Sequence, residues 1–163
     1  MAKKLYFLTA LWATMLQAAG LKPGELPELW NFSHAGEVEK IHTAYLNAGA
    51  DIIKTNTFGA NRLKFAGTEI KTADVIEQAV VVAKKACAKK PGSFVALEYG
   101  TNKGKLLAPY GDLPFEEAVS IYAEIVQAGV KAGADLILIE TMSDTYELKG
   151  RAFGSKKKTA ACR

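Results

Sequence analysis

The sequence predicts an α/β protein built from four parallel β/α units, and the main reason is an internal repeat. Residues 48–53 read Ala-Gly-Ala-Asp followed by two aliphatic residues, and residues 132–137 repeat this pattern. In both copies a segment with helical periodicity ends at the glycine, and the apolar run that follows is succeeded by polar residues. This order is typical of a helix, a tight stop, a buried parallel strand and a loop at the carboxyl end of that strand. In β/α proteins the reacting groups are concentrated in those loops.

The four predicted strands share a short apolar run that ends in polar residues. They cover residues 4–8, 50–55, 93–98 and 134–139. The predicted helices share apolar residues that recur at helical intervals. They cover residues 11–19, 35–48, 61–66, 73–89 and 115–132. Two prolines and a glycine make residues 22–27 a loop, and the spacing of Asp144 and Glu147 is typical of a cap that begins one more helix.

Apolar strands that alternate with helices indicate a parallel sheet covered by helices. The connection lengths fit either part of a barrel or an open doubly wound sheet. At 163 residues the chain is shorter than a complete eight-unit barrel of ~250 residues. No glycine-rich dinucleotide fingerprint and no phosphate loop follows the first predicted strand, which disfavours nucleotide binding.

The positive charge of the chain is concentrated at its C-terminal end. The formal net charge is +4, yet residues 1–150 carry 16 basic and 17 acidic side chains, and residues 151–163 carry basic ones alone. We therefore expect a folded domain at 1–150, a basic tail at 151–163 that is out of frame or disordered, and no nucleic-acid partner. Two distant cysteines, Cys87 and Cys162, give no disulfide framework, so a reducing cytoplasm is the expected compartment.

Residues 1–19 allow two interpretations, a short signal peptide or a first strand followed by a helix. Polar residues at Thr9, Thr14 and Gln17 interrupt the apolar run, which favours the strand and helix. No segment reaches the ~20 apolar residues of a membrane span, so no membrane partner is expected.

Three segments, in one continuous register, carry a resemblance to a known family. They read MLQAAGLKPG at 15–24, TNTFGANR at 55–62 and IETMSD at 139–144. Together they resemble the homocysteine S-methyltransferase (homocysteine-binding) domain, in particular the version at the N-terminus of cobalamin-dependent methionine synthases. The resemblance covers roughly residues 5–150 and implies a TIM (β/α)8 barrel, of which this chain would form the N-terminal half.

The resemblance also implies a reaction, which is zinc-activated methyl transfer to homocysteine to give methionine. In the family, zinc binds the sulfur of homocysteine and stabilises it as the thiolate, which attacks a methyl group on a corrinoid or folate-type donor. Cobalamin is the methyl donor of the resembling enzyme, and we do not expect this segment to bind it.

The resemblance assigns substrate-binding roles to three residues. Glu140 matches the carboxylate that binds the ammonium group of homocysteine, and Asn56 and Thr57 match the loop that lines its carboxylate. Judged as residues alone, Glu140 also suits a cap of the following helix, and Asn56 and Thr57 also suit hydrogen bonds within their own loop.

No residue is assigned to catalysis or to a metal. Asp144 fits a helix cap better than a ligand, and neither His34 nor His42 has neighbours at the spacing of a zinc site. The zinc of the family is held by three cysteines from the second half of the barrel, and Cys87 and Cys162 match none of them.

The end of the first strand also departs from the family. Its pattern Asp-Gly-Ala-Met-Gly is replaced here by Thr-Ala-Leu-Trp-Ala at residues 9–13. A one-base shift of suitable codons for residues 8–13 restores the family pattern, so we hypothesise local frameshifts there and in the tail. We therefore expect a fragment of the family domain that is inactive as this chain and binds homocysteine weakly. The alternatives are a non-catalytic half-barrel that self-associates through its open side, and a small α/β binding domain.

Overall fold

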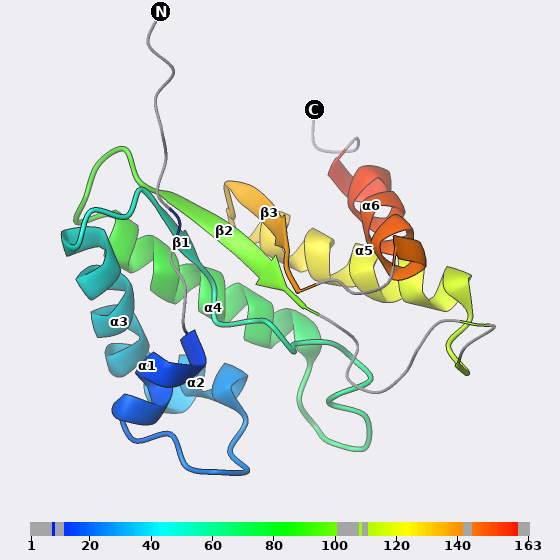
Figure 1. Cartoon of the computed structure of the whole chain (residues 1–163), viewed down its shortest axis with the longest axis horizontal. Coiled ribbons are helices and arrows are strands. Elements are labelled where there is room, and N and C mark those ends of the chain that lie inside the picture. The colour runs from blue at the N-terminus through cyan, green and yellow to red at the C-terminus, as the bar shows by residue number, and fades with distance from the viewer. Residues whose placement is uncertain (1–7, 9–11, 101–107, 109–110, 142–144, 160–163) are drawn as a thin grey trace, which may run out of the picture.

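The computed structural model describes residues 8, 12–100, 108, 111–141 and 145–159, and within them a parallel sheet lies against long helices (Figure 1). The strands are β1 (Ile52–Lys54), β2 (Phe94–Tyr99) and β3 (Leu136–Ile139), and they lie side by side in this order. The helices are α1 (Trp12–Ala18), the 3-10 turn η1 (Pro27–Leu29), α2 (Trp30–Ser33), α3 (Ala35–Asn47), α4 (Thr72–Cys87), α5 (Phe115–Lys131) and α6 (Thr145–Thr159).

Three of the four predicted strands are present, and the position of the fourth is marked by a single parallel bridge. Leu8 pairs with Ile52 of β1, which also pairs with Phe94 of β2. The Leu8 segment therefore lies beside β1, on the edge away from β2. The rest of the predicted first strand lies outside the described residues. The order of the sheet follows the order of the chain, as in a barrel built from consecutive β/α units.

The repeated glycines end two helices with the same hydrogen bonds. Gly49 and Gly133 have φ angles of 106° and 94°, the left-handed region that favours glycine. After α3, Ala50 N donates to Tyr45 O, and after α5, Ala134 N donates to Gly129 O, both at 3.0 Å. Each repeat is therefore a Schellman stop that turns the chain from a helix into a strand.

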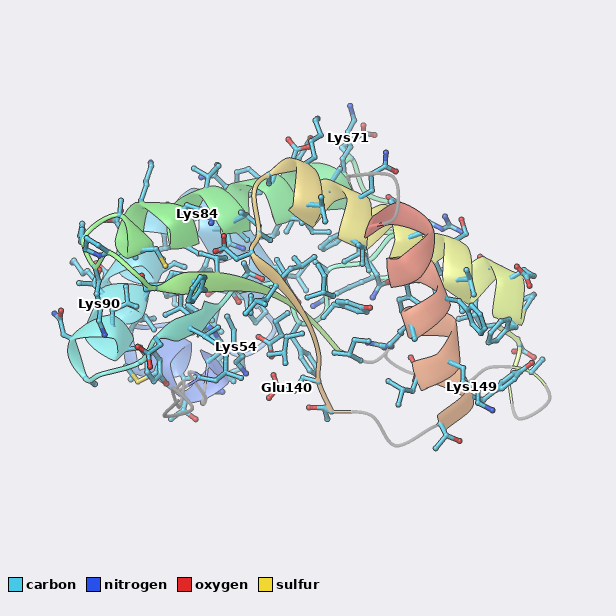
Figure 2. All side chains as sticks on the ribbon, turned by 90° about the horizontal axis from the view of Figure 1, so that it is seen from above. Lys54, Lys71, Lys84, Lys90, Glu140 and Lys149 are labelled. Atoms are coloured by element: carbon cyan, nitrogen blue, oxygen red, sulfur yellow. The ribbon has the colours of Figure 1, made fainter. Side chains whose placement is uncertain are left out.

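Helices α4 and α5 lie along one face of the sheet, whereas Lys54 and Glu140 lie on the opposite side (Figure 2). In the wall of a β/α barrel the long helices cover one face of the sheet, whereas in a doubly wound fold helices cover both faces. The arrangement of α4 and α5 is that of a barrel wall. The packing is close where α5 crosses β2. A Cβ atom at Gly129 would lie 2.4 Å from Cδ2 of Leu97, so this glycine lets the helix approach the strand.

The helix predicted at 61–66 is wrong, because these residues form a series of turns. The side-chain oxygen of Asn61 accepts hydrogen bonds from the backbone N–H groups of Leu63 and Lys64, at 3.0 and 2.9 Å. Its side-chain amide donates to Gly59 O at 3.2 Å. These bonds are those of a helix N-cap, but the turns do not extend into a helix, and Gly67, with a φ angle of 77°, follows them.

Helix α6 continues across the boundary predicted at residue 150. Arg151 is fully buried, donates to Glu147 at 2.7 Å and to Tyr99 O at 3.2 Å, and lies 4.5 Å from the centre of the Tyr122 ring. The first basic residue of the predicted tail is therefore part of the packed structure, because a buried guanidinium needs such partners. Residues 160–163 lie outside the described residues.

Candidate functional site

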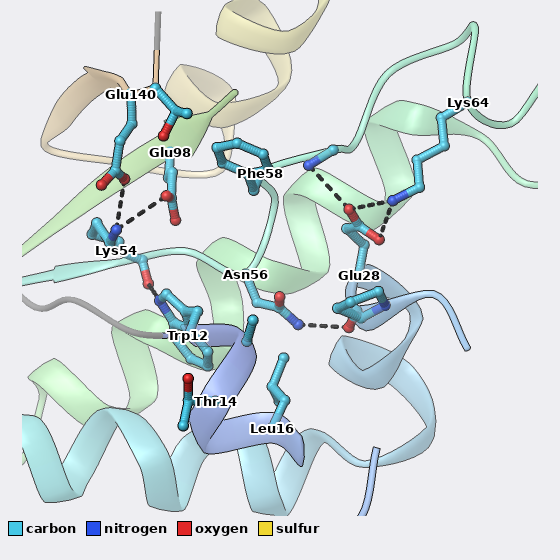
Figure 3. Close-up of a pocket in the computed structure, with 14 residues that line it drawn as sticks. Trp12, Thr14, Leu16, Glu28, Lys54, Asn56, Phe58, Lys64, Glu98 and Glu140 are labelled. Atoms are coloured by element: carbon cyan, nitrogen blue, oxygen red, sulfur yellow. Dashed lines mark hydrogen bonds and ion pairs between the residues drawn. The ribbon is translucent and has the colours of Figure 1, made fainter. Parts of the chain in front are cut away.

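Three charged side chains meet at the carboxyl edge of the sheet, one from each strand. Lys54 is the last residue of β1, Glu98 lies near the end of β2, and Glu140 directly follows β3. The ammonium nitrogen of Lys54 lies 3.1 Å from Oε1 of Glu98 and 2.6 Å from Oε2 of Glu140 (Figure 3). Because the carboxyl ends of parallel strands share one edge, residues that are 44 and 86 positions apart become neighbours. We call these three residues the lysine–carboxylate cluster.

The cluster is buried on one side and open on the other. The side chains of Lys54 and Glu98 are each 5% exposed, whereas that of Glu140 is 38% exposed. Burial, followed by the hydrogen bond with Glu140, raises the pKa of Glu98 to about 8. The same carboxyl–carboxyl hydrogen bond, with the contribution of Lys54, lowers the pKa of Glu140 despite partial burial.

Lys54 keeps its charge inside this cluster. Burial by itself would lower the pKa of its ammonium group, but the hydrogen bond to Glu140 and the charge of Glu98 outweigh it and raise the pKa. At neutral pH the cluster therefore holds a protonated Glu98, an ionised Glu140 and a charged Lys54. One positive and one negative charge balance each other, which is how a buried ion pair is tolerated.

The cluster faces a cavity of about 470 Å³. The cavity walls combine charged side chains with two aromatic rings, those of Trp12 and Phe58 (Figure 3). Trp12, the first residue of α1, donates its indole N–H to Lys54 O at 3.1 Å. This bond holds α1 against the end of β1 and closes one side of the cavity.

A second ion pair lies on the far wall of the cavity. The ammonium group of Lys64 lies 2.6 and 2.8 Å from the two carboxylate oxygens of Glu28, which also accepts a hydrogen bond from Gly59 N at 3.0 Å. Glu28 is only 3% exposed, so this pair braces η1 against the loop that follows β1. The cavity is thus bounded by two lysine–carboxylate pairs.

The structure brings two of the three predicted binding residues to this cavity. Glu140 and Asn56 line it, and the Asn56 amide donates to Pro27 O at 2.6 Å. Thr57 is fully buried instead, where its hydroxyl donates to Glu98 O at 2.5 Å and contacts the hydroxyl of Thr55 at 2.6 Å. Thr57 therefore lies beneath the cavity and fixes the backbone that carries Glu98.

Neither histidine lines the cavity. His34 stacks on Trp30 with ring centroids 4.1 Å apart, and His42 is buried against Trp12 in an edge-to-face contact. Asp144 lies outside the described residues. Sequence reasoning missed Lys54 and Glu98, although a signal was present, because a charged residue inside an otherwise apolar strand needs a buried partner.

The described residues do not fit the zinc ion that the family resemblance implies. They contain no group of three or more His, Cys, Asp or Glu side chains arranged to hold a metal. Cys87 is buried at the end of α4, packed with Leu46 and Val95, and burial raises the pKa of its thiol. In the cluster itself, the Lys54 ammonium already supplies the cation between the two carboxyl groups, which leaves no anionic donor set for zinc.

Comparison with known proteins gives the family. The family model described as homocysteine S-methyltransferase matches residues 10–162 of this sequence. The chain therefore belongs to the homocysteine S-methyltransferase family. The match includes the stretch beyond residue 150 and all three residues of the lysine–carboxylate cluster.

Curated relatives include two methionine synthases. The protein of Mycobacterium tuberculosis (strain ATCC 25618 / H37Rv) is 30% identical over 155 residues, which are 88% of this chain and 13% of the relative. That of Mycobacterium leprae (strain TN) is 28% identical over 134 residues, which are 80% of this chain and 11% of the relative. The chain thus spans about an eighth of the length of these methionine synthases.

Solved structures support the fold. The homocysteine methyltransferase MmuM from Escherichia coli, in its metallated form, superposes with a TM-score of 0.76 at 24% identity, over 99% of this chain and 61% of that chain. Its oxidised form gives a TM-score of 0.76 at 23% identity, over 95% of this chain and 59% of that chain. Within the described residues, no helix is long and apolar enough to cross a membrane.

Proposed function

We propose that the cavity at the carboxyl edge of the sheet is the amino-acid-binding part of a homocysteine S-methyltransferase site, and that this chain alone does not transfer the methyl group. The observation that carries the proposal is Glu140. It directly follows β3, stays ionised at neutral pH, is 38% exposed and faces a cavity of amino-acid size. An ionised, accessible carboxylate is the natural partner of the ammonium group of an amino acid.

The arrangement supports binding and orientation, with Glu140 receiving the ammonium group of homocysteine. The amide of Asn56 is held by Pro27 O and shapes the floor beside it. Thr57 contributes indirectly by fixing the backbone beneath Glu98. The binding is expected to be weak, because a partly exposed carboxylate that already has a lysine partner adds on the order of 1 kcal/mol or less for a second ammonium.

Methyl transfer needs a group that stabilises the thiolate of homocysteine, and the described residues supply none. Zinc would provide this stabilisation in the family reaction, but no described donor set fits it. The cluster places an ammonium group, not a metal, between its two carboxyl groups. We therefore infer that this half of a TIM barrel, with its four β/α units, contributes substrate contacts and not the activating group.

A second candidate function, a non-catalytic half-barrel that self-associates, is favoured by β3. This strand has a partner on one side only among the described residues, and its first residue, Leu136, is 44% exposed. An apolar strand with an open edge is a template for pairing with another strand. A second copy of this chain would supply one.

The test is a zinc-supplemented assay of methyl transfer to homocysteine, with the wild type and Glu140→Ala side by side. We expect turnover at background in both, and a weak binding signal for L-methionine that is present in the wild type and lost in Glu140→Ala. Glu117→Ala is the matched control, because Glu117 forms an exposed ion pair with Arg62 outside the cavity. Turnover that the wild type shows and Glu140→Ala abolishes would refute the proposal that this chain is inactive.

A further inference from the structure

The lysine–carboxylate cluster already holds a primary ammonium group, and that group belongs to the protein. The Lys54 ammonium lies 2.6 Å from the carboxylate oxygen of Glu140, the group that the proposed function assigns to the ligand. A lysine ammonium and the ammonium of an amino acid have the same charge and the same three N–H donors. One carboxylate oxygen cannot give both of them its shortest and most favourable contact.

From this geometry we propose that Lys54 is an internal competitor for the ammonium subsite, so that an amino acid binds at Glu140 only when the lysine is displaced. The inference rests on the proposed function, since it assumes that Glu140 receives the ammonium of the ligand. Lys54 thereby sets the specificity of the cavity. In the wild type the cavity favours ligands that lack an ammonium group over the amino acids of the same shape.

Two features make Lys54 a strong competitor. Its side chain is 5% exposed and extends from the last residue of β1, so the ammonium is held beside Glu140 at a high effective concentration. It also contacts Glu98, the second carboxyl group of the cluster, at 3.1 Å. The carbonyl group of Lys54 accepts the indole N–H of Trp12, which fixes the backbone from which the side chain extends.

The other cavity lysine is placed differently. Lys64 pairs with Glu28, whose Oε1 also accepts the backbone N–H of Gly59. Glu28 therefore has two hydrogen-bond donors on the opposite wall, and Lys64 pairs with Glu28 and not with Glu140. Among the two lysines that line the cavity, Lys54 alone contacts the carboxylate of the proposed ammonium subsite.

The test compares two probes, L-methionine and 4-(methylthio)butanoate, which is methionine without its amino group. Binding is followed by NMR titration, observing the S-methyl signal of the probe and the indole N–H of Trp12. We expect Lys54→Met to raise the affinity for L-methionine by about tenfold, while the affinity for 4-(methylthio)butanoate stays within about twofold. Lys131→Met, which breaks an exposed ion pair with Glu77, is the matched control and should change neither affinity.

A double variant guards against misfolding. The single variant Lys54→Met leaves two neighbouring carboxyl groups without their lysine partner. The double variant, Lys54→Met with Glu98→Gln, removes one of these carboxyl groups and keeps Glu140 as the only carboxylate of the cluster. The same gain for L-methionine is expected in this variant. Equal affinities for L-methionine in the wild type and both Lys54 variants would overturn the inference and leave the proposed binding function intact. If neither the wild type nor any variant binds either probe, both the inference about Lys54 and the proposed binding function are overturned.

Discussion

Replacing Gly129 with alanine tests the close contact between α5 and β2. The added Cβ would lie 2.4 Å from Cδ2, 3.1 Å from Cγ and 3.2 Å from Cδ1 of Leu97. Carbon atoms in contact prefer about 3.5–4.0 Å, so the helix and the strand must separate by roughly 1 Å or Leu97 must leave its rotamer. Leu97 is fully buried and its strand pairs on both sides, which leaves it little room.

The expected cost follows from two opposing contributions. Overpacking a close-packed core costs about 1–3 kcal/mol, whereas glycine to alanine within a helix returns about 1 kcal/mol. We therefore expect Gly129→Ala to lower the free energy of unfolding by up to about 2 kcal/mol, measured by urea denaturation followed by circular dichroism.

Gly150→Ala is the matched control. Gly150 is also buried in a helix, but the nearest atom to its added Cβ would be Cε2 of Phe115, at an ordinary 3.4 Å. This variant should gain up to about 1 kcal/mol of stability from helix propensity. The packing argument would be refuted if Gly129→Ala proved as stable as Gly150→Ala.

Three further predictions concern titration and association. The folded state keeps a proton on Glu98 up to about pH 8, whereas the unfolded chain loses it above the ordinary pKa of 4.5. The free energy of unfolding therefore falls as pH rises from 4.5 to about 8, by at most about 1.4 kcal/mol per pH unit. Glu98→Gln should flatten that slope in urea midpoints compared across the range, and an unchanged slope would contradict the assignment. His42 has no hydrogen-bond partner for either ring nitrogen in the described structure, and burial lowers its pKa to about 3. Below pH 6.5 the unfolded chain therefore binds a proton at this histidine, whereas the folded chain does not until about pH 3. His42→Leu should therefore reduce the loss of stability on acidification between pH 6.5 and 3, and a melting profile that keeps the wild-type acid dependence would argue against this. Finally, we expect sedimentation to show dimers or larger species that Leu136→Lys diminishes, since a charge on an open strand edge opposes pairing; a stable wild-type monomer would count against self-association.

Much of the secondary structure was predictable because its signals are local. The stops at Gly49 and Gly133 depend on a backbone conformation that glycine favours, and both repeats adopt it. Helices α4 and α5 begin and end within about two residues of the predicted bounds, because their apolar residues recur with helical periodicity. The family was also accessible to sequence reasoning, since three short motifs occur in one register and the family model matches the same region.

Where prediction from the sequence was wrong or incomplete, side-chain contacts decided the structure. At 61–66 the apolar pattern indicated a helix, but the chain forms a series of turns in which Asn61 binds the backbone N–H groups of Leu63 and Lys64. Arg151 was assigned to a tail by charge counting, and it is buried because Glu147 and Tyr122 provide an ion pair and an aromatic face. The charge pattern shows Glu147 four positions earlier, but it does not show that α6 packs beside Tyr122 of α5 and so buries Arg151.

Local patterns predicted the order of the strands and of the long helices, the positions of the tight stops, and the placement of Glu140 and Asn56 in loops at the carboxyl ends of strands. Which charges meet at those ends depends on how the strands are arranged in the folded chain. Lys54 reaches Glu98 and Glu140 because parallel strands in order β1, β2, β3 bring their ends to one edge. The protonation of these groups then depends on burial and on distances of a few ångströms, and such distances are set by strand register and helix packing, which no local pattern encodes.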